Sequence, residues 1–306
     1  MITLDVPSGT YVVAVSGGVD SVALLHLLHE MSRQAGSERR FIVAHFDHGI
    51  RSDSDDDRRH VQLLARHYGL PFAYERVELG AGASEAAARA ARYKFLHDVR
   101  RASGAQAIIT AHHEDDVIET ALLNLVRGTG SRGLHSLRSR QHVLRPLLGV
   151  PKKNLLSYAQ TNGLVWREDS TNANTAILRN YLRHRVVADM AKTHRSMLLK
   201  RSRKAAELNA EIDSIIANYL HLQPALDVLN RGSFIELPHV VAREVLAAWL
   251  RRGAVGVELN RKLLERLVVA AKTGHNGSRA DIGAGYQLHF SPGVISLVNL
   301  AKPSIV

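Results

Sequence analysis

Six residues between two apolar runs, SGGVDS (16–21), have the composition of an anion-binding loop. Gly17 and Gly18 let a backbone approach oxygen atoms without a Cβ clash, and Ser16 and Ser21 add hydroxyl donors. A loop of this kind before a helix also presents backbone N–H groups and the positive helix end. Asp20 would repel a phosphate unless it acts through Mg²⁺, which prefers carboxylate and phosphate oxygens. We therefore expect an anion site, with Asp20 as a candidate magnesium ligand.

Spacing alone leaves a second interpretation of this loop open. A glycine-rich turn capped by Asp20 or Ser21 is equally compatible with the pattern. The loop lacks the G-x-G-x-x-G pattern of dinucleotide-binding folds and the Gly-Lys-Ser/Thr ending of a Walker A loop. The missing lysine points away from γ-phosphate transfer.

A second cluster of reactive side chains is HHEDDVIET (112–120). Asp116 and Glu119 are three residues apart, so they share one face of a helix. A metal site made by His112, His113 and the acids is an alternative, but adjacent histidines lack the i,i+4 spacing of a helical zinc site. An acidic helix start exposed to solvent is the simpler alternative, since acids stabilise helix N-termini.

The elements that must position these residues alternate between strand-like and helix-like segments. Predicted strands are Tyr11–Val15, Phe41–His45, Phe72–Val77 and Ala107–Ala111, and predicted helices are Val19–Met31, Asp56–Tyr68, Ser84–Arg101 and Glu114–Val126. This order predicts an α/β fold, an open parallel sheet with helices on both faces. Ligands of such sheets bind at the carboxyl ends of the strands. SGGVDS, DHGIR (47–51) and HHEDD follow the first, second and fourth strands, so they should lie at that edge.

The remaining chain predicts a helical linker and a small α+β domain. Predicted helices are Pro151–Asn162, Thr175–Asp189, Lys192–Tyr219, Val240–Arg251 and Asn260–Lys272, and Gly274–Val298 alternates like β-structure. We expect a catalytic domain over 1–190, a basic helical linker over 191–219, and a small C-terminal domain over 220–306.

Charge and composition indicate the partners. The 306 residues carry a formal net charge of +11, and residues 179–204 contain nine Lys or Arg against Asp189 alone. A clustered positive charge favours a polyanionic partner. With no cysteine, the sequence excludes disulfides, thiol nucleophiles, iron–sulfur clusters and cysteine-type zinc sites. It shows no apolar run of membrane-spanning length and no secretion signal, so we expect a cytoplasmic location and no redox cofactor; a homodimer is compatible with the sequence.

The pattern SGG-x-DS after the first strand resembles the PP-loop of the N-type ATP pyrophosphatases, which cleave ATP between its α- and β-phosphates. Further motifs narrow the resemblance: AHFDHGIR (44–51), EAAARAARYKFL (85–96), TAHHEDDVIETALLNLVRGTGSRGL (110–134), RPLL (145–148), WREDSTN (166–172) and LRNYLRHRVV (178–187). Together they resemble the tRNA(Ile)-lysidine synthetase family over residues 10–190, and more weakly to the end. The resemblance implies the family's first C-terminal domain, and we expect its second to be absent.

What the resemblance implies is a two-step reaction. The C2 oxygen of the wobble cytidine in a CAU anticodon attacks the α-phosphate of ATP and releases pyrophosphate. L-Lysine then displaces AMP and leaves lysidine. The implied small-molecule substrates are ATP with Mg²⁺ and L-lysine, and the implied macromolecular partner is tRNA(Ile).

The resemblance also assigns roles to residues of this chain. The implied catalytic residues are Asp20, Arg92 and Asp116, with Arg89 as an alternative to Arg92. The implied ATP-binding residues are Ala14, Ser16, Gly17, Gly18, Val19, Asp20, Ser21, Ala44 and His48. The implied lysine-binding residues are His112, Asp116 and Glu119. The implied tRNA-binding residues are Arg127, Arg179, Asn180, Arg183 and Arg201, although Arg127 could equally compensate a helix C-terminus.

Three other functions share some of these sequence features. Other PP-loop tRNA enzymes transfer sulfur and generally rely on cysteines, which this chain lacks. Amidating synthetases fit the loop but not the basic segment or HHEDDVIET. A non-catalytic, basic RNA-binding protein would have a degenerate loop, yet Asp20, Arg92 and Asp116 are all present.

Overall fold

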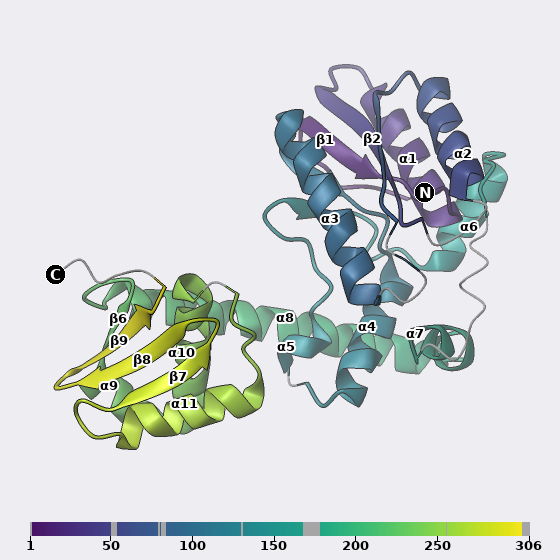
Figure 1. Ribbon diagram of the computed structural model, residues 1–306. Coiled ribbons are helices and arrows are strands. Elements are labelled where there is room, and N and C mark those ends of the chain that lie inside the picture. Colours follow the sequence, from purple (N-terminus) through teal and green to yellow (C-terminus); the bar gives the residue numbers. More distant parts are fainter. Residues whose placement is uncertain are drawn as a thin grey trace. The chain divides into compact units, whose positions relative to one another are not determined.

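The computed structural model describes residues 2–49, 54–78, 80, 84–129, 131–167, 178–254 and 256–301 (Figure 1). The chain divides into two compact units, Met1–Ala206 and Glu207–Val306. The division falls within the long helix α8 (Lys192–His221), inside the segment predicted as a basic helical linker. Most of WREDSTN, together with Ile50, Arg51 and Gly130 of the other motifs, lies outside the described residues.

The first unit alternates strands and helices, as the sequence predicts. Its elements are β1 (Gly9–Ala14), α1 (Val19–Ser32), β2 (Arg39–Asp47), α2 (Ser54–His67), β3 (Phe72–Arg76), α3 (Glu85–Ala102), β4 (Ala107–Ile109), α4 (Glu114–Val126), α5 (Ser131–Leu134), β5 (Val143–Leu144), α6 (Lys152–Thr161), α7 (Leu178–Tyr181), the π-helical segment η2 (Leu182–Val187) and the first part of α8. Ser84, the first residue of the predicted helix, caps α3 by accepting a hydrogen bond from the amide of Ala87 at 3.2 Å. The short elements α5 and β5 were not predicted.

Among the described residues of this unit, five strands form one parallel sheet in the order β3-β2-β1-β4-β5. The chain builds outward from β1 to β3 and then returns to the other side of β1 with β4. The strand order therefore reverses between β1 and β4, which is where open α/β sheets bind ligands. The loops that follow these two strands carry SGGVDS and HHEDD, so the topology brings the two predicted clusters to the same place.

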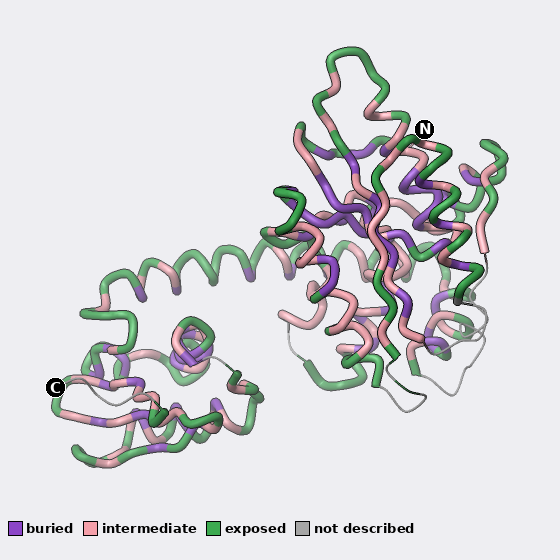
Figure 2. The backbone as a smooth tube through the Cα atoms, turned by 45° about the horizontal axis from the view of Figure 1, so that its top comes forward, coloured by how far each residue is buried: buried purple, intermediate pink, exposed green. Residues whose placement is uncertain are grey.

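Alternation along the strands produces two cores, one on each face of the sheet. Tyr11 and Val13 of β1 point to the face covered by α1, α2 and α6, whereas Val12 points to the face covered by α3 (Figures 1 and 2). Leu24, Leu25 and other fully buried side chains of α1 contribute about 1.5–3 kcal/mol each to folding. The prediction of helices on both faces of an open parallel sheet is confirmed.

The second unit is a small α+β fold, also as predicted. Its elements after α8 are β6 (Val228–Asn230), α9 (Arg231–Glu236), α10 (His239–Gly253), α11 (Arg261–Thr273), β7 (Arg279–Gly283), β8 (Tyr286–Ser291) and β9 (Val294–Asn299). In its described part, four strands form an antiparallel sheet in the order β6-β9-β8-β7. The core lies between this sheet and the helices, with Phe234, Leu246, Leu267 and Leu288 completely buried. The short elements β6 and α9 were not predicted.

One predicted helix, Thr175–Asp189, differs in the structure. Its described part begins at Leu178, and from Leu182 onward the backbone is π-helical rather than α-helical. The amide of Ala188 donates to the carbonyl of Arg183, five residues earlier, at 3.2 Å. From Leu182 onward, the predicted α-helix is therefore replaced by a wider, π-helical turn. No helix in the described ranges is long and apolar enough to cross a membrane.

Candidate active site

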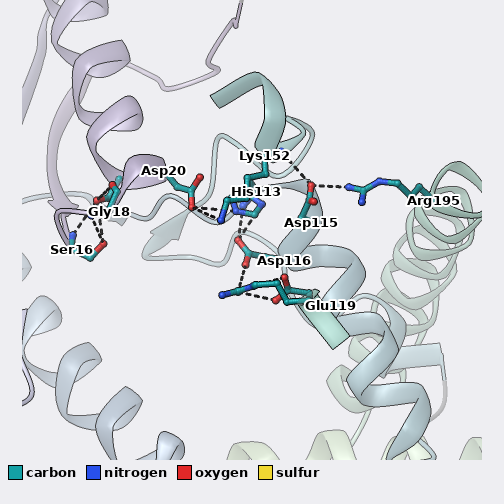
Figure 3. A network of polar contacts seen from close by, with 11 residues as sticks. Ser16, Gly18, Asp20, His113, Asp115, Asp116, Glu119, Lys152 and Arg195 are labelled. Carbon is teal, nitrogen blue, oxygen red and sulfur yellow. Dashed lines mark hydrogen bonds and ion pairs between the residues drawn. The ribbon is translucent and has the colours of Figure 1, made fainter. Parts of the chain in front are cut away.

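The loop after β1 is closed on itself by the hydroxyl of Ser21. Its Oγ accepts hydrogen bonds from the amides of Ser16 and Gly17, both at 3.2 Å, and donates to the carbonyl of Gly18 at 2.9 Å. Gly18 is the N-cap of α1 and makes no side-chain cap bond. The alternative of a turn capped by Asp20 is therefore wrong: Ser21 holds the turn, and Asp20 points elsewhere (Figure 3).

The two glycines of this loop differ in whether the backbone conformation requires them. Gly17 has φ +93°, a left-handed conformation that L side chains rarely adopt. Gly18 has an ordinary φ of −74°, and a Cβ there would make only ordinary contacts, 3.6 Å from Ser16 Oγ and 3.9 Å from the carbonyl of Arg167. The protein itself therefore does not require glycine at 18. Bare backbone at the N-terminus of a 14-residue helix suits an approaching oxyanion.

Asp20 belongs to a polar network that joins this loop to α4 (Figure 3). His113 Nε2 lies 3.4 Å from Asp20 Oδ2, and His113 Nδ1 lies 3.6 Å from Asp116 Oδ2. The backbone amide of His113 donates to Asp116 Oδ2 at 2.9 Å. One histidine at the end of β4 thus links the loop carboxylate with a carboxylate of HHEDD.

Charge in this network sets two pKa values in opposite directions. Burial alone would raise the pKa of Asp20, but the hydrogen bond to His113 and the charges of His113, Lys152 and Arg183 outweigh it and lower the pKa. Burial would lower the pKa of His113, but its hydrogen bond to Asp20 and the charges of Asp116 and Asp20 raise it. The pair is therefore stabilised as carboxylate and imidazolium.

Arg183 lies at the same cluster rather than on an open face. Its Nε and Nη2 donate to Glu119 Oε1 and Oε2 at 2.7 and 2.9 Å, and its Nη2 lies 3.6 Å from Asp116 Oδ1. The Glu119 side chain is only 3% exposed. The prediction that Asp116 and Glu119 share one helix face is confirmed, because one guanidinium contacts both.

Asp115, which directly precedes Asp116 on α4, anchors two neighbouring helices. Its Oδ1 accepts from the amide of Lys152 at 3.2 Å and lies 2.7 Å from Arg195 Nη2 (Figure 3). Lys152 also places Nζ 3.8 Å from Asp20 Oδ2. The start of α6 and the start of α8 are therefore both tied to the first turn of α4.

His112 sits in a different environment from His113. Its Nδ1 lies 2.8 Å from Thr110 Oγ1. Burial, followed by the charges of Arg145, Arg92 and Arg89, lowers the pKa of His112 to about 3. The ring is therefore neutral at physiological pH.

The other residues predicted to bind ATP lie near the strand ends. Val19 begins α1, and Ala14 ends β1. Ala44 is 1% exposed in the core beneath α3, so a ligand could reach only its backbone. His48 follows β2 and packs edge-on against Phe46, with ring centroids 4.9 Å apart. Arg92 lies on α3 beside Tyr93.

The residues predicted to bind tRNA do not form one surface. Arg179 donates to Glu85 on α3 at 2.8 Å, whereas Arg183 bonds Glu119 on α4. Both arginines therefore pair with carboxylates of neighbouring helices. Asn180 is buried, at 8% exposed. Arg127 after α4 and Arg201 on α8 are exposed.

Four further residues of this region carried no predicted role: Tyr93, Arg145, Lys152 and Arg167. The amide of Arg167 donates to the carbonyl of Gly17 at 3.0 Å, which ties the loop to the segment after α6. Lys152 offered a signal, since a lysine in the first turn of a helix opposes the dipole and needs another reason to be there. Arg145 offered a second signal as the first residue of the RPLL motif.

The donor set around the loop fits a single magnesium ion shared with phosphate. No group of three or more metal-binding side chains gathers in the part of the chain that the structure describes. Asp20 Oδ1, however, is buried without a hydrogen-bond partner. One carboxylate oxygen beside an oxyanion cradle suits Mg²⁺, which takes its other ligands from phosphates and water.

Comparison with known proteins identifies the family. A model of the PP-loop domain matches residues 2–190. The tRNA(Ile)-lysidine synthase of Chlorobaculum tepidum is 32% identical over 307 residues, which cover 95% of this chain and 91% of that protein. The chain belongs to the tRNA(Ile)-lysidine synthase family.

Other members of the tRNA(Ile)-lysidine synthase family match at higher identity over less of their length. The Thermus thermophilus relative is 46% identical over 184 residues, 58% of this chain and 35% of that protein. The Geobacter sulfurreducens relative is 34% identical over 87% of this chain and 56% of that protein. This chain thus spans between about a third and about half of the length of these two relatives.

A solved structure supports the fold of this family member. The U34-tRNA thiolase NcsA from Methanococcus maripaludis, determined with its 4Fe-4S cluster, has a TM-score of 0.54 and 16% identity, covering 66% of this chain and 73% of that one. At this identity the likeness concerns the fold alone. The present chain contains no cysteine with which to hold a similar cluster.

Proposed function

We propose that this protein ligates L-lysine to C2 of the wobble cytidine in the CAU anticodon of tRNA(Ile), using ATP and releasing AMP and pyrophosphate. The observation that carries the proposal is the network Asp20–His113–Asp116, which joins an anion-binding loop to a pair of carboxylates. Adenylation needs the anion-binding loop, and capture of a lysine needs the pair of carboxylates. Family membership supports the same reaction.

In the adenylation step, the loop would hold the pyrophosphate portion of ATP. The amides of Val19 and Asp20 at the start of α1 have no acceptor within their own helix, whereas that of Ser21 donates to Gly18, so the first two are available to phosphate oxygens. Asp20 would hold Mg²⁺ through its partnerless Oδ1, and the bound ion would neutralise phosphate charge. His113 and Lys152 keep Asp20 ionised for that role. Arg92 would stabilise the charge that builds on the α-phosphate.

In the second step, Asp116 and Glu119 would receive the ammonium groups of lysine. Asp116 would take a proton from the attacking amine, as a general base within reach of the adenylated cytidine. Arg183 already holds both carboxylates with a guanidinium, which supports the view that the site selects a cation. Arg183 is then a positioning residue of the lysine site, rather than the tRNA contact predicted from its sequence.

RNA would be held by exposed cations outside the network. Arg127 and Arg201 are exposed, as are Lys200, Arg203 and Lys204 on α8. Such contacts position a nucleic acid through its phosphates, without reading its sequence. We propose a catalytic domain over 1–190 joined by the basic helix to a C-terminal domain, 220–306, that contributes to tRNA recognition.

The test is transfer of labelled lysine. Purified protein is incubated with ATP, Mg²⁺, labelled lysine and tRNA carrying a CAU anticodon, and label in the tRNA is measured. We expect incorporation by the wild-type protein and none by Asp20→Asn, which keeps the shape of the side chain but loses the charge that binds Mg²⁺. Folded wild-type protein that binds the tRNA but transfers no lysine would favour the non-catalytic RNA-binding alternative.

A further inference from the structure

Three arginines from two parts of the first unit converge on one tyrosine. The Cζ atoms of Arg89 and Arg92, both on α3, lie 4.8 and 5.7 Å from the ring centroid of Tyr93. Arg145 follows β5, and its Nη2 donates to the Tyr93 hydroxyl at 3.3 Å. We call Arg89, Arg92 and Arg145 the arginine cluster. Its two sides are 52 residues apart along the chain at the Tyr93–Arg145 contact, so only the folded chain assembles it.

The arginine cluster carries positive charge that is not paired with carboxylates among the described residues. Within the described ranges, none of its members is ion-paired with a carboxylate. Glu85 acts on Arg92 electrostatically, but its carboxylate is bonded to Arg179 at 2.8 Å. Gathering guanidinium groups without counter-charge is costly, and the cost is relieved when an anion binds among them.

Arg145 provides the independent sign of a ligand. The residue is only 6% exposed, and its Nε is buried without a hydrogen-bond partner. Nη1 donates to the carbonyl of Arg138 and Nη2 to Tyr93, so the guanidinium is held in place while one donor stays unused. A buried donor of this kind costs free energy until something accepts its hydrogen bond.

His112 connects the arginine cluster to the network of the proposed active site. The charges of all three arginines act on its ring, and it precedes His113 directly in the chain. Because its ring stays neutral, His112 adds no repulsion between the cluster and the network. The arginine cluster therefore lies near His112, in the segment between β4 and α4.

We propose that Arg145, together with Arg89, Arg92 and His112, forms a second oxyanion subsite that binds one phosphate group, and that Tyr93 positions the three guanidinium groups. The proposal rests on the function proposed above, which supplies two sources of phosphate: the α-phosphate of ATP and the RNA backbone beside the modified base. Both present the same chemistry, a phosphate with two or more charged or partly charged oxygens. Fork-shaped guanidinium donors match such oxygens in pairs.

The experiment measures binding rather than activity. The full chain is titrated with Mg·ATP without RNA, and separately with an anticodon stem-loop RNA carrying CAU at several salt concentrations. The variants are Arg145→Gln, Arg145→Lys and Tyr93→Phe, and the matched control is Arg101→Gln, which removes an exposed charge from the same helix α3. Melting temperatures establish that each variant is folded.

We expect Arg145→Gln to lower the affinity for one of the two ligands by about tenfold or more, while Arg101→Gln changes neither affinity. Loss of ATP affinity would assign the subsite to the α-phosphate. Loss of RNA affinity, with a salt slope reduced by about 0.7, would assign it to the RNA backbone. Tyr93→Phe keeps the ring beneath Arg89 and Arg92 but releases Arg145, so it should reproduce part of the same loss.

Wild-type affinity for both ligands in folded Arg145→Gln would overturn the subsite. If that variant does not fold, Arg145→Lys and Tyr93→Phe decide instead: wild-type binding of both ligands by both variants overturns it. The lysine-transfer assay on the wild-type protein separates this outcome from a failure of the proposed function. A wild-type protein that transfers lysine while the Arg145 variants bind normally would reject the subsite alone.

Discussion

Two buried arginines, Arg145 in the first unit and Arg231 in the second, are treated differently by the fold. Arg231 is 7% exposed, and all three of its guanidinium nitrogens bond the protein. Nε donates to the carbonyl of Ala271 at 3.0 Å, Nη1 to Asn276 at 3.1 Å, and Nη2 to the carbonyl of Gly274. Arg145 is equally buried but leaves Nε without a partner.

The same difference separates the two units as a whole. Among the described residues, every buried side-chain nitrogen or oxygen that lacks a hydrogen bond belongs to the first unit, and Asp20, His113, Arg145 and Arg179 contribute four of them. Each such atom costs about 1–3 kcal/mol, so a fold retains it where a ligand supplies the missing partner. Arg231 instead closes the end of α11, where carbonyl groups and the helix dipole favour a cation. Asp20, His113 and Arg145, which belong to the two proposed sites, are thus incompletely bonded, whereas Arg231 is fully bonded.

The largest expected effect is at Asp116, which lies 3.6 Å from the partnerless Nδ1 of His113 in the first unit. Asp116→Asn should reduce lysine transfer by about a hundredfold to ten thousandfold, because an amide neither pairs with an ammonium nor accepts its proton. The Asn oxygen can still accept from the amide of His113, so the melting temperature should stay close to wild type. Transfer of labelled lysine and thermal unfolding are measured together. Equal losses of activity and of folded protein would mean that Asp116 is structural.

Arg231→Met tests whether the fully bonded arginine of the second unit stabilises the fold. Removing the guanidinium leaves the carbonyls of Ala271 and Gly274 without a donor, so we expect a loss of about 3 kcal/mol in the unfolding free energy. Mg·ATP affinity should be unchanged, because Arg231 has no role in the loop. Urea unfolding and ATP titration measure the two effects. A variant as stable as wild type would contradict a structural role for Arg231.

A pH experiment probes His112, which burial and neighbouring arginines keep neutral. Its pKa is about 3 when folded and about 6.5 when unfolded, so the unfolded chain binds the extra proton between these values. Stability is therefore lost as pH falls below about 6.5, and the His112 contribution to that loss reaches about 2 kcal/mol at pH 5. Urea unfolding of wild type and His112→Gln at pH 7 and pH 5 should show a smaller loss in the variant. Identical losses would show that His112 is protonated in the folded protein.

The smallest effect is a control for the comparison. Ser84 caps α3 and Asn260 caps α11, with hydrogen bonds of 3.2 and 2.8 Å from exposed positions. Ser84→Ala and Asn260→Ala should each cost about 1 kcal/mol of unfolding free energy. Similar losses of unfolding free energy in both units would show that the two units differ in the hydrogen bonding of buried groups and not in their helix caps. A much larger cost at Ser84 would show that the units differ in their ordinary helix signals too.

The sequence by itself determined the order of the elements and the places where chemistry is concentrated. Some signals act within a few residues, so they can be recognised in the sequence alone. They include the alternation of apolar residues, helix caps such as Ser84 and glycines such as Gly17. These local signals predicted the parallel sheet, the HHEDD helix and the α+β second unit. They also placed Asp20 and Asp116 at strand ends that the sheet topology brings together.

Only the tertiary structure decided which charges meet. A long arginine side chain looks the same in a sequence whether it pairs with Glu119, as Arg183 does, or bonds a helix end, as Arg231 does. Arg145 and Tyr93 are 52 residues apart, and their contact depends on how β5 and α3 pack. The contacts of Arg183 with Glu119 and Asp116 likewise join η2 to α4, which are far apart in the sequence. Pairing of distant charges depends on burial and packing in three dimensions, which local periodicity does not encode.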